Sequence, residues 1–98
     1  MCSIDTALAR IQYYVDEYLS VPDFSWDKYN FKKRSYQRWA AYEICNQIMD
    51  KPYEDSVVVV ETFILEMTVY ACYGKDEQCS FIFQNAIETA KDILSLLN

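Results

Sequence analysis

The 98-residue sequence contains no histidine, and this absence excludes several kinds of catalytic and metal site. Histidine is the commonest general base and the commonest partner of a serine or cysteine nucleophile. The four cysteines form no C-x-x-C pair, so the usual spacing of a zinc site is missing as well. Glu61 and Glu66, five residues apart, would lie about 140° apart on a helix and cannot share a paired-carboxylate site there. We therefore expect a non-enzymatic protein without metal or cofactor.

Residues that form turns are also scarce, because the chain has one glycine, Gly74, and only two prolines, Pro22 and Pro52. An all-β domain of this length would need many tight turns, and most of these require Gly, Asn or Pro. One glycine also cannot build a phosphate-binding loop. Few turns imply long elements, and 52% hydrophobic residues are enough for one core. We predict a single all-α domain over 1–98, folded as an up-down four-helix bundle with short connectors.

Apolar residues that recur three and four positions apart predict the first two helices. The first is expected to begin after Ser3, whose side chain can cap it, and to stop by 20–21 because the next residues precede Pro22. The second is expected to begin within 27–35 and to end near 49–50. The start of the second helix is the least well defined of these boundaries.

The third helix is expected to begin at Pro52 and the fourth to follow Gly74, with Asp76 as its cap. Four consecutive valines in the third segment favour a strand by propensity. However, 57–73 is too long for one strand, contains no turn residue and keeps helical spacing of its apolar residues. The length of the segment therefore favours a helix.

The sequence also lacks targeting signals and cysteine patterns. It opens with no secretory signal, and no apolar run reaches the roughly 18 residues of a membrane span. We expect a cytoplasmic protein with no membrane association, in which thiols stay reduced. Cys72 and Cys79 flank Gly74, and a disulfide across a helical hairpin is left open for this pair alone.

Acidic residues outnumber basic ones by 15 to 9, for a formal net charge of −6. Four of them surround the first connector, and the first and third connectors of an up-down bundle lie at the same end. Six residues are therefore expected to form one acidic patch: Asp16, Glu17, Asp23, Asp27, Asp76 and Glu77. Such a patch commonly serves solubility. The sharper interpretation is a surface that imitates phosphates and occupies a basic nucleic-acid channel of another protein.

The cations are concentrated in one segment, 28–38, which is followed by a tryptophan. The members of this basic cluster are Lys28, Lys32, Lys33, Arg34, Arg38 and Trp39. They provide the alternative interpretation, a small regulatory or nucleic-acid-binding module, although on a helix the cations surround its start instead of forming one stripe. A structural role is open as well, because Arg34 and Arg38 can pair with acids on neighbouring helices such as Glu61 and Glu66.

The third helix is apolar on two sides, because Val58, Leu65 and Val69 lie off its main apolar face. Either this helix is the most buried one, or its second side is a contact surface. A homodimer seam is one interpretation of that surface.

Four segments from about Phe31 onward, RSYQRWAAYEI, IMDKP, VETFILEM and AKDILSLL, occur in this order. The succession resembles small helical proteins of unassigned function carried on mobile elements of low-GC bacteria. Some small acidic proteins of such elements are anti-CRISPR or anti-restriction inhibitors, which bind a host nuclease and block its nucleic-acid site. The resemblance implies a protein-binding inhibitor whose partner is a bacterial nuclease or another nucleic-acid-binding enzyme. It implies no particular binding residue, so the acidic patch depends on charge pattern alone.

Overall fold

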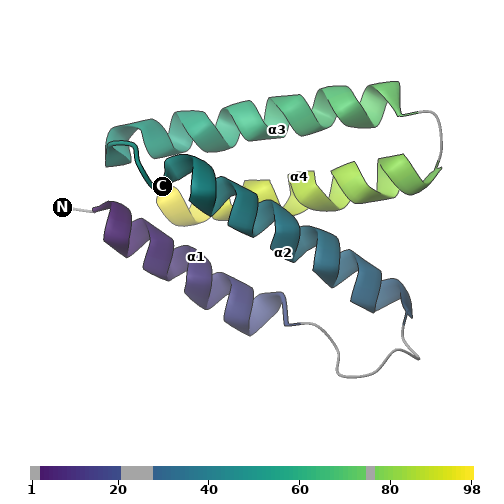
Figure 1. Ribbon diagram of the computed structural model, residues 1–98, viewed down its shortest axis with the longest axis horizontal. Helices are drawn as coiled ribbons and strands as arrows, with labels where there is room; N and C mark the ends of the chain where they lie inside the picture. The colour runs from purple at the N-terminus through teal and green to yellow at the C-terminus, as the bar shows by residue number, and fades with distance from the viewer. Residues whose placement is uncertain (1–2, 21–27, 75–76) are drawn as a thin grey trace.

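The structure, a computed structural model, describes residues 3–20, 28–74 and 77–98 (Figure 1). Its described part contains helices and no strand, so the prediction of an all-α four-helix fold is confirmed. The elements are α1 (Ile4–Tyr18), α2 (Lys28–Ile48), the short 3-10 helix η1 (Tyr53–Asp55), α3 (Ser56–Tyr73) and α4 (Glu77–Leu97).

Helix α1 begins and ends where the sequence predicts. The hydroxyl of Ser3 accepts a hydrogen bond from the Thr6 backbone N–H at 3.2 Å, which satisfies one of the unpaired donors of the first turn. At the other end, the N–H of Leu19 donates to the carbonyl of Val15, and no further turn follows. Both predicted boundaries of this helix are confirmed.

The valine run is helical, as its length predicts. Helix α2 begins at Lys28 and ends at Ile48, and Pro52 then precedes η1, which continues directly into α3. The sequence offers Asp27 and Asn30 as candidate caps of α2; Asn30 lies inside the helix, and Asp27 lies outside the described residues. Tertiary burial of Val59 and Val60 against the other helices outweighs the preference of valine for strands.

Gly74 follows the last residue of α3, at a position where a side chain would be crowded. A Cβ at this position would lie 3.0 Å from the Cβ of Cys79 and 3.3 Å from the carbonyl oxygen of Tyr70. Its φ of −64° is open to any residue, so the close approach of α4 is the reason for glycine. Cys72 is exposed and has a free thiol, and Cys79 is half-buried. Asp76, the expected cap of α4, lies outside the described residues.

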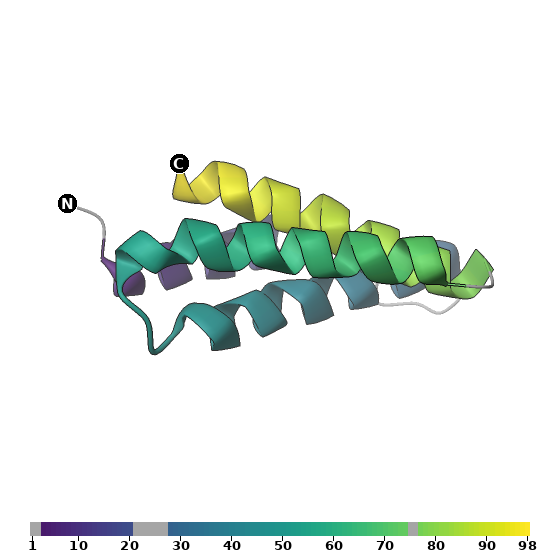
Figure 2. The same cartoon turned by 90° about the horizontal axis from the view of Figure 1, so that it is seen from above.

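The four helices form a flattened, diamond-shaped bundle with extents of 43 × 33 × 19 Å (Figures 1 and 2). Helices α2 and α4 face each other across the shortest dimension, and α1 and α3 lie on opposite edges. Helix α4 packs against all three of the others, most extensively against α3. Helix α2 crosses α4 obliquely, so it diverges from α3 along its length (Figure 1).

Alanines on α2 and α4 allow these two helices to approach closely. Ala40, Ala41, Ala86 and Ala90 are all fully buried, and small side chains at a helix contact shorten the interaxial distance. Larger apolar residues fill the space on either side. The largest of these in the core are Ile11, Val15 and Leu19, Ile44 and Ile48, Val60 and Phe63, and Ile93.

One expectation about the face of α1 is wrong. The helical spacing of the apolar residues of α1 predicts Tyr18 on the core face, but it is 63% exposed, and Tyr14 is buried in its place. The hydroxyl of Tyr14 donates a hydrogen bond to the Asp92 carboxylate on α4 at 2.7 Å. Both tyrosines fit helical spacing, and only Tyr14 has an acceptor for its hydroxyl where it packs on α4.

The helix over Tyr53–Tyr73 is long and apolar enough to cross a membrane, by length and composition alone. This corrects the expectation that no apolar segment reaches the length of a membrane span. An 18-residue window of this helix is apolar enough on average even though the helix contains Glu61 and Glu66. Core helices of soluble proteins pass the same test, and 28% of this window is buried inside the structure.

Candidate functional site

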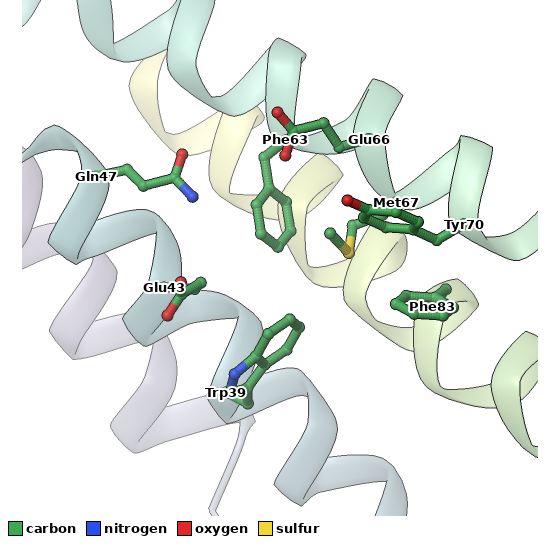
Figure 3. Close-up of a pocket in the computed structure, with 8 residues that line it drawn as sticks. All are labelled: Trp39, Glu43, Gln47, Phe63, Glu66, Met67, Tyr70 and Phe83. Carbon is green, nitrogen blue, oxygen red and sulfur yellow. The ribbon is translucent and has the colours of Figure 1, made fainter.

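The divergence of α2 from α3 leaves a groove of about 300 Å³ between them (Figure 3). We call it the α2–α3 groove. It is lined by Trp39, Glu43 and Gln47 from α2, by Phe63, Glu66, Met67 and Tyr70 from α3, and by Phe83 from α4. A volume of this size lies at the lower end of the range found for ligand pockets.

Aromatic rings form the floor and both walls of the groove. Phe63 is 1% exposed and supports the wall residue Trp39, whose ring centroid lies 6.3 Å away. On the opposite side, Tyr70 packs against Phe83 with centroids 5.4 Å apart. Trp39 and Tyr70 are nevertheless 44% and 51% exposed, so each presents part of its ring to an incoming group.

Carboxylates stand on both rims of the groove. Glu43 lies on the α2 side next to Gln47, and Glu66 lies across the gap on α3 (Figure 3). Among the described residues, neither carboxylate has a hydrogen bond or an ion pair. Two like charges that face each other oppose closure of the groove and attract a cation into it.

The groove continues along α2 into a second hollow of about 470 Å³. The two hollows share Trp39 and Phe83, and the second is completed by Ser35, Tyr36 and Ile82. From Ser35 to Gln47 a helix rises about 18 Å, at 1.5 Å per residue. The whole depression is therefore long enough for about three turns of a partner helix.

The structure gives Arg38 a partner different from the expected one. Its Nη1 donates to the carbonyl of Leu19, the C-cap of α1, at 3.4 Å, and its Nη2 donates to the Tyr42 hydroxyl at 3.0 Å. The guanidinium also lies 5.7 Å from the centroid of the Tyr42 ring. Arg38 thus ties α2 to α1 as a structural residue, but through a carbonyl at the negative end of a helix dipole and not through an acid of α3.

The other members of the basic cluster divide into engaged and free cations. Arg34 donates to the buried amide oxygen of Gln37 at 2.9 Å, and Lys33 lies 3.9 Å from the Glu88 carboxylate. Lys28 and Lys32 are exposed and pair with no other described residue. The expected pairing of Arg34 or Arg38 with Glu61 or Glu66 is therefore wrong.

The described members of the expected acidic patch do not lie together. Asp16 and Glu17 are exposed near the C-terminal end of α1, and Glu77 is exposed at the N-terminal end of α4. Figures 1 and 2 both separate these two helix ends, because α1 and α4 belong to different, splayed hairpins. The remaining members, Asp23, Asp27 and Asp76, lie outside the described residues.

Sequence reasoning missed the two rim carboxylates of the groove. On a helical wheel Glu43 shares a polar arc with Lys28 and Lys32, which predicts that it faces water, and Glu66 was expected to pair with an arginine. A signal for the α2 wall is the series Trp39, Glu43, Gln47, which lie four residues apart and therefore share one face of the helix. No sequence signal shows that this face meets α3 across a gap.

The second apolar side of α3 is solvent-exposed. Val58, Leu65 and Val69 are 61%, 67% and 49% exposed, and they belong to the helix that forms one edge of the bundle (Figure 2). Helix α3 is thus buried on one of its two apolar sides only, and the second side is open to solvent.

The chemistry of the described residues concentrates on binding groups. No set of three or more Cys, Asp or Glu in the described ranges is placed to hold a metal ion. Burial raises the pKa of the Cys45 thiol, which favours its unreactive protonated form. Comparison of the chain with protein-family models, with curated proteins and with solved structures finds no match in any of the three.

Proposed function

We propose that the protein is a non-enzymatic binding protein whose α2–α3 groove receives a basic, partly apolar segment of another protein. The observation that carries this proposal is the pair of unpaired carboxylates, Glu43 and Glu66, on opposite rims of an aromatic groove. The groove joins apolar area, aromatic faces and negative charge, and a lysine or arginine side chain complements all three at once.

The cation of such a side chain would lie between the rim carboxylates, while its methylene stem would pack on the aromatic walls. A cation over a tryptophan or tyrosine face contributes about 0.5–2 kcal/mol, depending on how far water is excluded. Trp39 and Tyr70 present such faces, and Phe63 below them keeps the floor dry. The length of the depression along α2 allows several residues of the partner to bind in line.

In its most concrete form the proposed function is inhibition of a nuclease or another nucleic-acid-binding enzyme, in the manner of anti-CRISPR or anti-restriction proteins. Two features support a basic target surface. The chain carries a net charge of −6, and three of its nine cations, Lys33, Arg34 and Arg38, are engaged within the protein. The net negative charge would steer a basic surface toward the protein, and the two rim carboxylates add a local attraction at the groove.

Direct nucleic-acid binding is less well supported. It would require phosphate-facing cations on one surface, and only Lys28 and Lys32 of the basic cluster are free among the described residues. Two contacts supply a weak, strongly salt-dependent interaction at most.

The test is affinity capture from bacterial lysate followed by mass spectrometry, with purified partner binding and enzyme inhibition measured afterwards. The groove variant is Glu43→Gln with Glu66→Gln. Its matched control is Glu17→Gln with Glu77→Gln, which removes the same charge from two exposed sites outside the groove. We expect the groove variant to weaken binding of the purified enzyme at least about tenfold, while the control binds as the wild type does.

Equal weakening by both variants would assign binding to overall charge and contradict the role of the groove. Capture of no nucleic-acid enzyme, together with retention of labelled DNA or RNA that Lys28→Ala and Lys32→Ala abolish, would replace the proposal with the nucleic-acid-binding alternative.

A further inference from the structure

The outer side of α3 carries a regular stripe of exposed residues. The stripe consists of Val58, Thr62, Leu65, Val69 and Cys72, which follow one another at spacings of four, three, four and three residues. A 3.5-residue repeat of this kind is the spacing with which one α-helix packs along another. We call these five residues the outer stripe.

The outer stripe points directly away from the core of its own protein. At 100° per residue, Leu65 lies about 160° from Phe63 and about 140° from Val60, and both of these residues are buried in the core. Helix α3 forms one edge of the flattened bundle, so no other described helix covers this side (Figures 1 and 2). A second helix can therefore approach along the whole stripe.

The shape of the surface around the outer stripe is complementary to itself, because a protruding side chain lies beside two hollows. Leu65 stands between a hollow of about 240 Å³, lined by Thr62, Glu66, Val69 and Tyr70, and a hollow of about 310 Å³, lined by Glu61, Ile64 and Leu94. A protruding side chain beside a hollow is what a two-fold interface requires, because each copy must offer both the knob and the hole.

We propose that the outer stripe is the seam of a homodimer in which α3 packs antiparallel against α3 of a second copy. In this arrangement Val58 faces Val69 of the second copy and Leu65 faces its Thr62. Each facing pair forms one layer of the seam. A layer combines either two valines or a leucine with a threonine, so the layers are of similar volume.

Charge selects the antiparallel direction. Glu61 and Glu66 flank the outer stripe on opposite sides and are the two charged residues of α3. In a parallel pair, a residue that flanks the seam faces the residue five positions later on the other helix. Glu61 of each copy would therefore face Glu66 of the other, and these two contacts between like charges would destabilise the parallel dimer. In the antiparallel pair Glu61 instead lies near Thr68 of the second copy, and the seam itself carries no charge.

The size of the surface is that of a modest dimer. With Tyr70 and Tyr73 at its edge, 51% and 79% exposed, the outer stripe offers several hundred Å² of side chain, on the order of the roughly 800 Å² per partner in a standard interface. None of the five residues of the outer stripe lines the α2–α3 groove, although Glu66 and Tyr70 border both surfaces, so the dimer does not depend on the proposed function.

The first experiment is sedimentation equilibrium of the whole chain at several protein concentrations. We expect the wild type to show a concentration-dependent dimer, and Leu65→Glu to raise its dissociation constant about a hundredfold or more, because two buried leucines are lost. Tyr13→Glu is the control, since Tyr13 is similarly exposed, at 64%, but lies on α1. Circular dichroism confirms that each variant is folded.

A monomeric wild type, or a Leu65→Glu protein that dimerises as the wild type does, would overturn the proposal. A wild type that is monomeric in buffer but sediments with phosphatidylcholine vesicles would assign the stripe to a lipid surface instead.

The second experiment tests direction by oxidative cross-linking. Val58→Cys and Val69→Cys are prepared separately, each in a Cys72→Ser background. The antiparallel seam predicts a disulfide-linked dimer when the two are mixed and little when each is oxidised alone, since only the mixture brings two new thiols into reach. A linked dimer from each variant alone, together with linkage of the wild type through Cys72, would show a parallel seam and overturn the proposed arrangement.

Discussion

The two flanks of α2 use the same kinds of side chain, but only the flank that faces α1 is closed. There, Arg38 bonds to the carbonyl of Leu19 and to Tyr42. On the flank that faces α3, Trp39 and Glu43 border a groove, and Glu66 stands opposite Glu43. The two flanks differ in the group that the neighbouring helix places opposite α2. The end of α1 places a carbonyl opposite the Arg38 cation, whereas α3 places the Glu66 carboxylate across the groove from the Glu43 carboxylate. A cation and a carbonyl close the contact between α2 and α1, whereas two carboxylates of the same charge leave the α2–α3 groove open as a candidate binding site.

The largest effect on the free energy of unfolding is expected at Phe63, which belongs both to the groove and to the core. Phe63→Ala removes the floor of the groove and a fully buried ring, and we expect it to lower the free energy of unfolding by about 3–5 kcal/mol. Urea denaturation followed by circular dichroism measures this. Leu65→Ala, two residues along and 67% exposed, should change the free energy by less than about 0.5 kcal/mol in a monomeric sample. Equal losses from the two substitutions would contradict the assignment of floor and surface.

The protein should lose stability when the hydrogen bond between α1 and α4 is removed. Tyr14→Phe leaves the ring in place but deletes the 2.7 Å bond to Asp92, and we expect a loss of about 1–2 kcal/mol at neutral pH. Urea denaturation of the two proteins in parallel measures the loss. A change close to zero would show that water replaces the bond.

The Tyr14 contribution should also depend on pH. Burial, and then the hydrogen bond to Asp92, raises the pKa of Tyr14 above its ordinary value. Because the folded-state pKa is the higher one, the contribution is fully present below the unfolded-state value of about 10 and decreases as pH rises through the folded-state value. The difference in unfolding free energy between wild type and Tyr14→Phe should therefore shrink in alkaline solution. A constant difference would contradict this.

Arg38 and Lys32 give a smaller contrast within the basic cluster. Arg38→Ala should cost about 0.5–1 kcal/mol, because it removes partly exposed hydrogen bonds and the packing of its stem on Tyr42. Lys32→Ala should change the unfolding free energy by less than about 0.5 kcal/mol, since Lys32 is exposed and pairs with no other described residue. Chemical denaturation distinguishes the two, and the reverse order would assign the structural role to Lys32.

The smallest effect on stability should come from the rims of the groove. Glu43→Gln with Glu66→Gln removes two unpaired charges of the same sign, so the unfolding free energy should stay within about 0.5 kcal/mol of the wild type or rise slightly. The same variant is the one expected to lose partner binding. A marked loss of stability would show that the carboxylates hold the fold together.

The helices and their ends were readable from the sequence because their causes are local. Ser3 caps α1 through its own next turn, and the close approach at Gly74 coincides with a position where the sequence offers its one glycine. The helical state of the valine run followed from length and spacing, which do not depend on the rest of the fold.

The burial of Tyr14 and the α2–α3 groove could not be predicted, because each depends on how the α1–α2 and α3–α4 hairpins cross. The partners of Arg38 could not be predicted either, because they depend on how α1 and α2 lie against each other. Helical spacing places Tyr14 and Tyr18 on nearly the same face of α1, and only the position of Asp92 on α4 decides between them. Likewise, the spacing of Trp39 and Glu43 defines a face of α2, but the oblique crossing of α4 decides that this face diverges from α3.

Helix α4, against which the other three helices all pack, also sets the order in which the chain can fold during synthesis. Helices α1, α2 and α3 leave the ribosome before their common neighbour exists, so the nascent chain holds an apolar α3 with neither its core nor its outer side covered. Closure of the bundle must wait until α4 has been translated, and it then joins α3 first, because the two are adjacent in sequence and local contacts form fastest. A ribosome stalled just before Glu77 is released from the exit tunnel would therefore present a chaperone substrate instead of a folded domain.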